Sequence, residues 1–173
     1  MRKLKFTLDR RSLETIYFTF IRPILEYGDV IWNNCTLNDK QELDKIQNEA
    51  ARIVSGATQL VSISDLYHET GWEVLETRRK KHRLILLYKM INDQSPNYLS
   101  SLVPPLVGQQ SKYNFRNSDL YQTIPARTNL YSHSFLPSVI QEWNCLPIET
   151  RTSDSLQMFK RHLNRGKVYP PPK

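Results

Sequence analysis

The strongest constraint on the fold is one predicted helix in which a polar run is followed directly by an apolar run. The helix spans about 73–92 and contains Arg78-Arg79-Lys80-Lys81-His82-Arg83 and then Leu84-Ile85-Leu86-Leu87-Tyr88. Six polar residues cover more than one helical turn, so no face is wholly apolar there. Some of their stems must lie along a core with their charged heads at its rim. The apolar run that follows is therefore expected to be buried on more than one side.

Apolar residues at helical spacing predict further helices along the rest of the chain. The first has an apolar face formed by Leu13, Ile16, Tyr17, Phe20 and Ile21. Further predicted helices cover about 24–32, 39–55, 62–70 and 135–143, and a last one follows residue 153 with Leu156, Phe159 and Leu163 on one face. The pattern is typical of a mainly α-helical protein.

Particular residues predict where these helices begin and end. Pro23 lacks an N–H donor and should kink or end the first helix, while Gly28 is expected to let a neighbour approach closely. Gly56 is placed to cap a helix in the left-handed conformation. Ser62 and Ser153 are expected to cap the helices that follow them, because their hydroxyls accept from free N–H groups.

The predicted fold is a small helical bundle followed by a looser helical region with a long irregular segment. We expect a helical domain over 1–103, an irregular segment over 104–134, and carboxy-terminal helices with a proline-rich tail over 135–173. So long a segment without helical period is unusual in a compact domain. It is a functional loop, a disordered stretch, or a pair of short strands, for which 120–124 and 128–131 are the candidates.

The charge of the chain points to an anionic partner. The 173 residues carry a formal net charge of +7, with a pI of about 9.5. Such a balance favours nucleic acid or an anionic membrane surface. The alternative is a basic surface that only keeps the protein soluble.

Several other functional classes are disfavoured by the sequence. Cys35 and Cys145 lie far apart and the four histidines are scattered, so no metal site or cofactor is predicted. His68 and Glu69 are adjacent, which points their side chains apart on a helix, and no activated nucleophile accompanies them. No apolar run approaches the roughly 20 residues that span a bilayer. We expect a protein that has no membrane partner and lies inside the cell, in either the nucleus or the cytoplasm.

A series of short segments, taken in order, carries a resemblance to a known family. They are Ile21-Arg22-Pro23-Ile24-Leu25-Glu26-Tyr27-Gly28 with Trp32; Gln47-Asn48-Glu49-Ala50-Ala51-Arg52; Leu75-Glu76-Thr77-Arg78-Arg79-Lys80-Lys81-His82; Tyr88-Lys89 with Pro96, Tyr98 and Leu99; Pro125-Ala126-Arg127-Thr128; and Trp143-Asn144-Cys145-Leu146-Pro147. Together they resemble the thumb and carboxy-terminal region of a reverse transcriptase from a jockey-like or CR1-like non-LTR retrotransposon.

The resemblance implies a function without catalysis in this chain. In that family the thumb helices hold the template–primer duplex, while palm carboxylates bind the metal ions and an upstream endonuclease nicks DNA. The chain contains no Asp-Asp dipeptide. The expectation is a non-catalytic fragment of an RNA-directed DNA polymerase that binds nucleic acid weakly and non-specifically. A polymerase palm domain is the other implied partner. The alternative is a helical protein-interaction domain with an orphaned apolar interface.

The basic run is the candidate nucleic-acid site, because clustered cations bind the phosphate backbone without sequence preference. The candidate residues are Lys80, Lys81, Arg83 and Arg79. The alternative is a solvated helix face. Within the family-like pattern, Arg78, Arg79 and His82 lean toward structural roles. Lys80, Lys81 and Arg83 are then the stronger phosphate candidates.

Two further surfaces are predicted. The first helix is apolar over more than one stripe, which predicts an exposed patch around Phe18, Phe20 and Leu25. Aromatic and basic residues also alternate around 113–116 and 127–133. They either stack on single-stranded bases or anchor the irregular segment to the core.

Overall fold

The structure is a computed structural model that describes residues 1–109 and 117–165. It is mainly helical, as the sequence predicts. The chain divides into two compact units, Met1–Arg79 and Lys80–Lys173. The division lies inside helix α6, Leu75–Ile91, whereas the sequence pattern predicts a boundary after residue 103. The reason is that the beginning and the end of α6 belong to separate hydrophobic cores.

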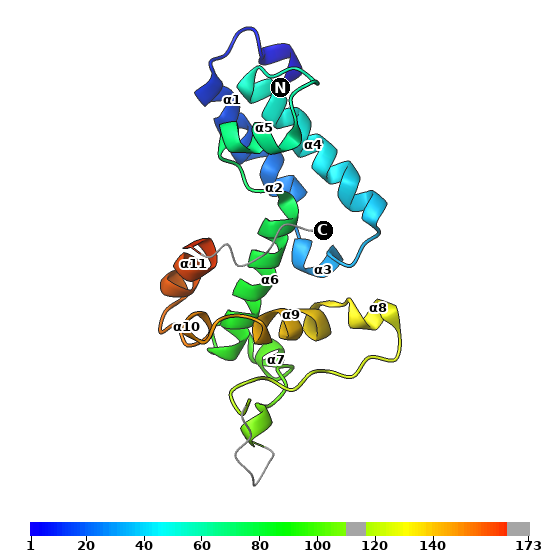
Figure 1. Cartoon of the computed structure of the whole chain (residues 1–173), viewed down its shortest axis with the longest axis vertical. Coiled ribbons are helices and arrows are strands. Elements are labelled where there is room, and N and C mark those ends of the chain that lie inside the picture. Colours follow the sequence, from blue (N-terminus) through cyan, green and yellow to red (C-terminus); the bar gives the residue numbers. More distant parts are fainter. Residues whose placement is uncertain (110–116, 166–173) are drawn as a thin grey trace. The chain divides into compact units, whose positions relative to one another are not determined.

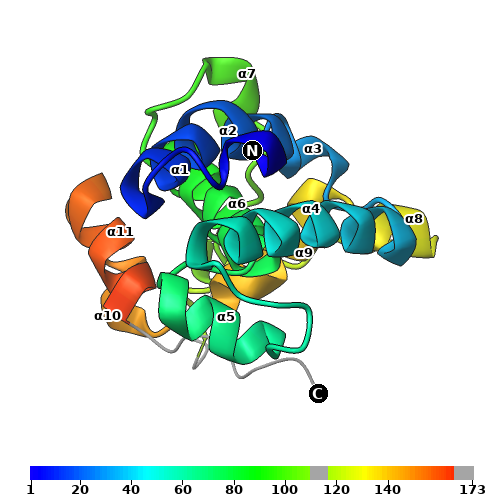
Figure 2. The same cartoon turned by 90° about the horizontal axis from the view of Figure 1, so that it is seen from above.

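The first unit is built from helices that precede α6 (Figure 1). They are the short 3-10 helix Arg2–Leu4, α1 Arg10–Ile16, the π-helix Tyr17–Ile21, α2 Arg22–Leu25, α3 Asp29–Trp32, α4 Leu37–Ser55 and α5 Ile63–Thr70. Both views place α5 alongside α4 (Figures 1 and 2).

Pro23 and Gly28 shape the amino-terminal helical stretch in different ways: the helix continues through Pro23 after a π-helical turn, whereas it breaks at Gly28. Proline cannot donate a main-chain hydrogen bond, and its ring crowds the preceding turn. The π-helix just before it widens that turn, with the Arg22 N–H donating to the Tyr17 carbonyl. Gly28 adopts a φ of 64°, which ends α2 and starts α3. A Cβ there would meet Trp32 only at an ordinary 3.8 Å. The predicted close approach, and the predicted uninterrupted helix over 24–32, are therefore wrong.

The ends of α4 and α5 follow the sequence signals. The N–H of Asp39 donates to the hydroxyl of Thr36 at the start of α4 (3.3 Å). Gly56 ends α4 with a φ of 73°, which confirms the predicted glycine cap. Asp65 donates its N–H to the hydroxyl of Ser62 (3.1 Å), so the predicted cap of α5 is also confirmed.

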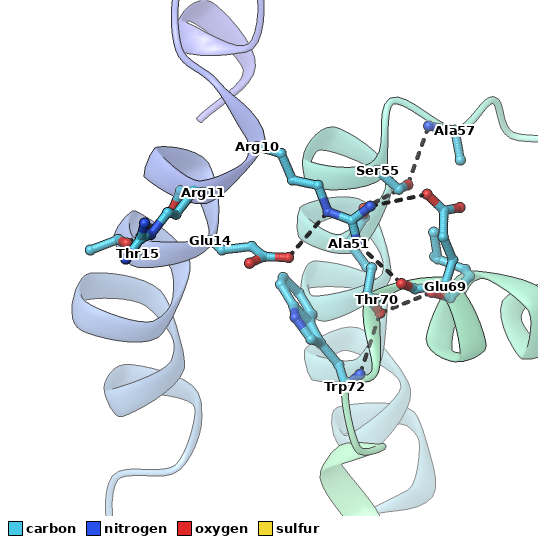
Figure 3. A network of polar contacts seen from close by, with 11 residues as sticks. Arg10, Arg11, Glu14, Thr15, Ala51, Ser55, Ala57, Glu69, Thr70 and Trp72 are labelled. Carbon is cyan, nitrogen blue, oxygen red and sulfur yellow. Dashed lines mark hydrogen bonds and ion pairs between the residues drawn. The ribbon is translucent and has the colours of Figure 1, made fainter.

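A polar cluster joins α1 to α5 within the first unit (Figure 3). Arg10 pairs with Glu14 on its own helix, and its guanidinium donates to the backbone carbonyl of Glu69 at 3.0 Å. Nearby, the Thr70 hydroxyl accepts from the Trp72 N–H. Apolar contacts add to these bonds, because Leu13 of α1 is buried against α4 residues. Glu69 is thus held by Arg10.

The interior of the first unit holds a hydrogen-bonded network centred on Gln47 of α4. The Tyr17 hydroxyl donates to Gln47 Oε1 at 2.8 Å. Gln47 Nε2 in turn donates to the Tyr67 hydroxyl (2.9 Å) and to the Glu73 carbonyl (2.8 Å). The ring of Tyr17 stacks on Trp72 with centroids 4.1 Å apart. One buried amide therefore ties α4 to α5, to the π-helix and to the segment before α6.

This network makes the stability of the first unit sensitive to alkaline pH. Burial raises the pKa of Tyr67 to about 12 and raises that of Tyr17 as well, from an ordinary value of about 10. Both phenols must stay neutral in the folded state. Their stabilisation is complete below about pH 10 and is lost as the pH rises toward 12. We expect tyrosinate absorbance to rise and helical circular dichroism to fall together between about pH 10 and pH 12. Tyr67→Phe should weaken the pH dependence, and ionisation of these tyrosines without unfolding would contradict the expectation.

The second unit continues from α6 with shorter helices. They are α7 Asn97–Ser100, the 3-10 helix Val107–Gln109, α8 Asn129–Ser132, α9 Phe135–Asn144, α10 Ile148–Arg151 and α11 Leu156–Arg165. Its core is formed by Leu84, Leu87, Tyr88, Val139, Ile140, Trp143, Leu146, Phe159 and Leu163. The ring of Phe159 stacks on Tyr88 at 4.6 Å. The predicted inward face of the last helix is thus confirmed.

Two local predictions in this unit are wrong. In the described part of 104–134, strand pairing is limited to an isolated bridge between Leu106 and Tyr121. The second candidate strand is helix α8, because the Thr128 hydroxyl accepts from a first-turn N–H and caps it. At α11 the accepting hydroxyl belongs to Ser155, which receives the Met158 N–H at 3.2 Å. Ser153 instead donates to the Thr150 carbonyl (2.8 Å).

Candidate nucleic-acid interface

The structure places the two candidate arginines of α6 in the interior. Arg79 and Arg83 are 2% and 3% exposed. Arg83 pairs with Glu142 of α9 at 3.1 Å and donates to the hydroxyl of Ser138. The Arg79 guanidinium lies 5.7 Å from the centre of the Trp32 ring. Guanidinium groups held this way do not face solvent, which argues against the predicted phosphate contacts of both residues.

Arg78 has a structural partner, in line with the role that the sequence pattern favours. Its guanidinium donates to both carboxylate oxygens of Glu26, with Nη2 to Oε2 at 3.0 Å. These hydrogen bonds raise the pKa of Arg78 further above its ordinary value. Because Glu26 is the C-cap residue of α2, the pair holds the amino-terminal end of α6 against the end of α2 within the first unit.

Lys80 and Lys81 are the members of the predicted set that reach the surface. Both are half-buried. Lys81 Nζ donates to Oδ1 of Asn164 at 2.7 Å. This bond places the ammonium group of Lys81 beside α11, a helix that contains none of the predicted binding residues.

Helix α11 carries its own row of basic residues on the side away from the core. Phe159 and Leu163 are buried, whereas Lys160, Arg161 and Arg165 are exposed. Lys160 lies one turn before Asn164, so it is a neighbour of the Lys81 contact. No Asp or Glu occurs in α11. We call Lys81, Lys160, Arg161 and Arg165 the basic face.

The basic face does not coincide with the longest run of charge in the sequence, which lies in α6 and predicts a different set of residues. A detectable signal was present in the alternation within 156–165, where basic residues occupy positions between the apolar ones. An amphipathic helix with basic residues as its only charges on the polar side is a better indicator of a cationic surface than a continuous run. A continuous run occupies all sides of a helix, so part of it must be buried.

The predicted apolar patch is partly wrong. Phe20 is 67% exposed, but Phe18 lies at 36% against Trp72, and Leu25 is buried at 5%. Other apolar residues are more exposed than these: Ile24, Tyr27 and Ile31 at 76%, 84% and 83%. The exposed apolar surface thus follows α2 and α3 rather than centring on Leu25.

The predicted base-stacking residues fall in two groups. Tyr113, Phe115 and Arg116 lie outside the described residues. In the other group, Arg127 is exposed and Tyr131 is 47% exposed on α8. Stacking by these residues stays a prediction.

Over residues 1–109 and 117–165, no group of three or more His, Cys, Asp or Glu side chains is arranged to hold a metal ion. In the same residues, no helix combines the length and the apolar character that a membrane crossing requires. Comparison with protein-family models, curated proteins and solved structures finds no match to this chain.

Proposed function

We propose that the chain is a non-catalytic thumb and carboxy-terminal fragment of a retrotransposon RNA-directed DNA polymerase that binds nucleic acid through the basic face. The ordered series of family-like segments supports the polymerase origin. The net charge of +7 supports a polyanionic partner. Contacts of this kind act on phosphates, so the binding is weak and independent of sequence.

The observation that carries the binding proposal is the Lys81–Asn164 hydrogen bond of 2.7 Å. It brings a cation of α6 together with the exposed cations of α11 inside one compact unit. Cations gathered on one surface can contact successive phosphates of a single backbone. Isolated cations spread over a protein cannot do so.

The experiment measures duplex binding by fluorescence anisotropy over a range of salt concentrations. Non-specific affinities are typically about 10⁻⁴ to 10⁻⁶ M at physiological salt. Replacing Lys160, Arg161 and Arg165 together by alanine should weaken binding to every duplex by a similar factor. The dependence of log K on log salt should flatten by up to about three units, roughly one for each lost contact.

A matched control removes the same charge from the first unit. Lys3, Lys5 and Arg11 are exposed, and their replacement by alanine lowers the net charge equally. It should leave most of the salt dependence in place. Equal losses in the two triple variants would show that only total charge matters, and unchanged binding in the α11 variant would refute the basic face.

The second candidate function, a helical protein-interaction domain, rests on the exposed apolar residues of the first unit. Phe20, Ile24, Tyr27 and Ile31 occur within 12 residues of sequence and are 67–84% exposed. Exposed apolar surface of more than a few hundred Å² is unusual on a soluble monomer. Binding through such a surface changes little with salt, so the same titration separates the two functions. A palm domain is the partner that the resemblance implies.

A further inference from the structure

The first unit contains an open cleft beside α4 that neither the basic face nor the apolar residues of α2 and α3 include. Its volume is about 330 Å³. The lining residues are Gln41, Asp44, Lys45 and Asn48 of α4, Ile63 and Tyr67 of α5, and Val74 before α6. This volume lies at the lower end of the range for small-ligand sites.

The walls of the cleft are apolar and aromatic. Ile63 and Val74 are 48% and 46% exposed, which is high for aliphatic side chains on packed helices. The Tyr67 ring is held in place because its hydroxyl donates to Asn48 and accepts from Gln47. The cleft therefore offers a fixed aromatic ring and aliphatic side chains to a flat apolar ligand.

Two of the polar groups that line the cleft, a carboxylate and a carboxamide, lie one turn apart on α4. Asp44 is half-buried, and within the described residues no hydrogen bond or ion pair ends on its carboxylate. Burial raises its pKa, while attraction to Arg79 partly opposes the shift. Asn48 uses its Oδ1 to accept from Tyr67, which leaves its amide N–H groups to donate. The cleft thus presents an acceptor and a donor side by side.

The geometry points to a binding site for the guanine base of a single-stranded nucleic acid or a free nucleotide. Asp44 would accept from the adjacent N1–H and N2–H groups of guanine, and the Asn48 amide would donate to O6. Guanine suits this pair because its Watson–Crick edge carries two neighbouring donors beside an acceptor. Uracil, cytosine and adenine each lack that arrangement. Bases of single strands are commonly held by stacking together with hydrogen bonds to this edge.

Charge favours a nucleotide over a cationic ligand. A carboxylate in an apolar cleft could also accept an arginine side chain. However, Lys45 lines the cleft with Glu42 as its ion-pair partner, Arg79 and Lys40 act on Asp44 against Glu76, and the whole chain is at +7. The net positive charge of the chain disfavours a basic peptide and attracts the phosphate attached to a base. The inference rests on the proposed nucleic-acid function but uses a different surface of the protein.

The test is a nuclear magnetic resonance titration of the ¹⁵N-labelled full chain with GMP, IMP, AMP, CMP, UMP and arginine amide. GMP should shift the amide signals of Asp44, Asn48 and Tyr67. IMP lacks the N2 amino group, so it loses one of the two hydrogen bonds to Asp44 and should bind about tenfold more weakly than GMP. AMP, CMP and UMP should bind more weakly still. Equal shifts with all nucleotides, or saturation by arginine amide alone, would overturn the proposal.

Protein variants give an independent arm. Asp44→Asn removes an acceptor from a half-buried site at no loss of shape and should reduce the GMP preference over AMP about tenfold or more. The matched control is Glu49→Gln on the same helix, which pairs with Arg2 outside the cleft and should leave the preference unchanged. If Asp44→Asn keeps the full preference, the assignment of Asp44 is wrong.

A last arm identifies the source of the base and separates this proposal from the basic face. A mixed-sequence single strand with one guanine is compared with the same strand carrying inosine there. If the guanine strand binds more tightly than GMP and inosine weakens that binding, the ligand of the cleft is a strand. If the strand and GMP bind with equal affinity, the ligand is a free nucleotide. The Lys160, Arg161 and Arg165 triple variant should retain the GMP shifts. Salt-dependent duplex binding without any guanine preference would refute the cleft and leave the proposed function intact.

Discussion

Replacing Arg83 with methionine is expected to destabilise the second unit by roughly 3–5 kcal/mol, as removal of one partner of a buried ion pair typically does. Arg83 is 3% exposed and its guanidinium binds Glu142 and Ser138. Methionine fills much of the same space, so the loss comes from removing the Arg83–Glu142 ion pair rather than from a cavity. Urea unfolding followed by circular dichroism measures the change.

A double-mutant cycle tests this cause. In Arg83→Met combined with Glu142→Gln, no buried charge remains in the pair, so much of the lost stability should return. Lys81→Met is the control on the same helix, and it should cost less than about 1 kcal/mol because Lys81 is only half-buried. Additive effects of the two Arg83–Glu142 changes would contradict the pairing. Arg83→Met should also retain duplex binding per folded molecule, since its side chain does not face solvent.

Replacing Gln47 with leucine is expected to cost about 3 kcal/mol of stability in the first unit. The amide accepts from Tyr17 and donates to Tyr67 and to the Glu73 carbonyl, all at 2.8–2.9 Å. Leucine has a similar volume but cannot replace any of these bonds. Each buried polar group left without a partner costs roughly 1–3 kcal/mol. Thermal and urea unfolding should both report the loss.

The matched control is Gln41→Leu, the same change on the exposed side of α4. Its effect should stay within about 0.5 kcal/mol, as for most surface substitutions. In the Gln47→Leu variant the pKa of Tyr67 should rise further above its unfolded value, because the Gln47 amide N–H that donates to the phenol and lowers its pKa is lost. An unfolding midpoint for Gln47→Leu equal to that of Gln41→Leu would show that the network contributes nothing.

Local chemistry made much of the helical framework predictable from the sequence. The left-handed glycine at Gly56 and the Ser62 cap follow from backbone rules that act within a few residues. The apolar spacing of Phe159 and Leu163 likewise identified the buried side of the last helix. These signals need no knowledge of what lies elsewhere in the chain.

Predictions that depended on distant neighbours fared less well. The two sequence-based strand candidates differ from the structure, because Thr128 caps a helix and the other candidate contributes only a bridge at Tyr121. The division inside α6 was also unpredictable. It depends on which residues Leu75 and Leu84 meet, and these belong to different cores.

The sequence by itself determined that the chain is helical and basic and that a helix ends at Gly56, since these are properties of composition and of short-range backbone geometry. Only the tertiary structure decided which cations face solvent. Arg83 and Lys81 stand two residues apart in one run, yet one pairs inside with Glu142 and the other reaches Asn164 beside the exposed cations of α11. The physical reason is that neighbouring residues of a helix point in different directions, and what each one meets is set by packing with helices far away in the sequence.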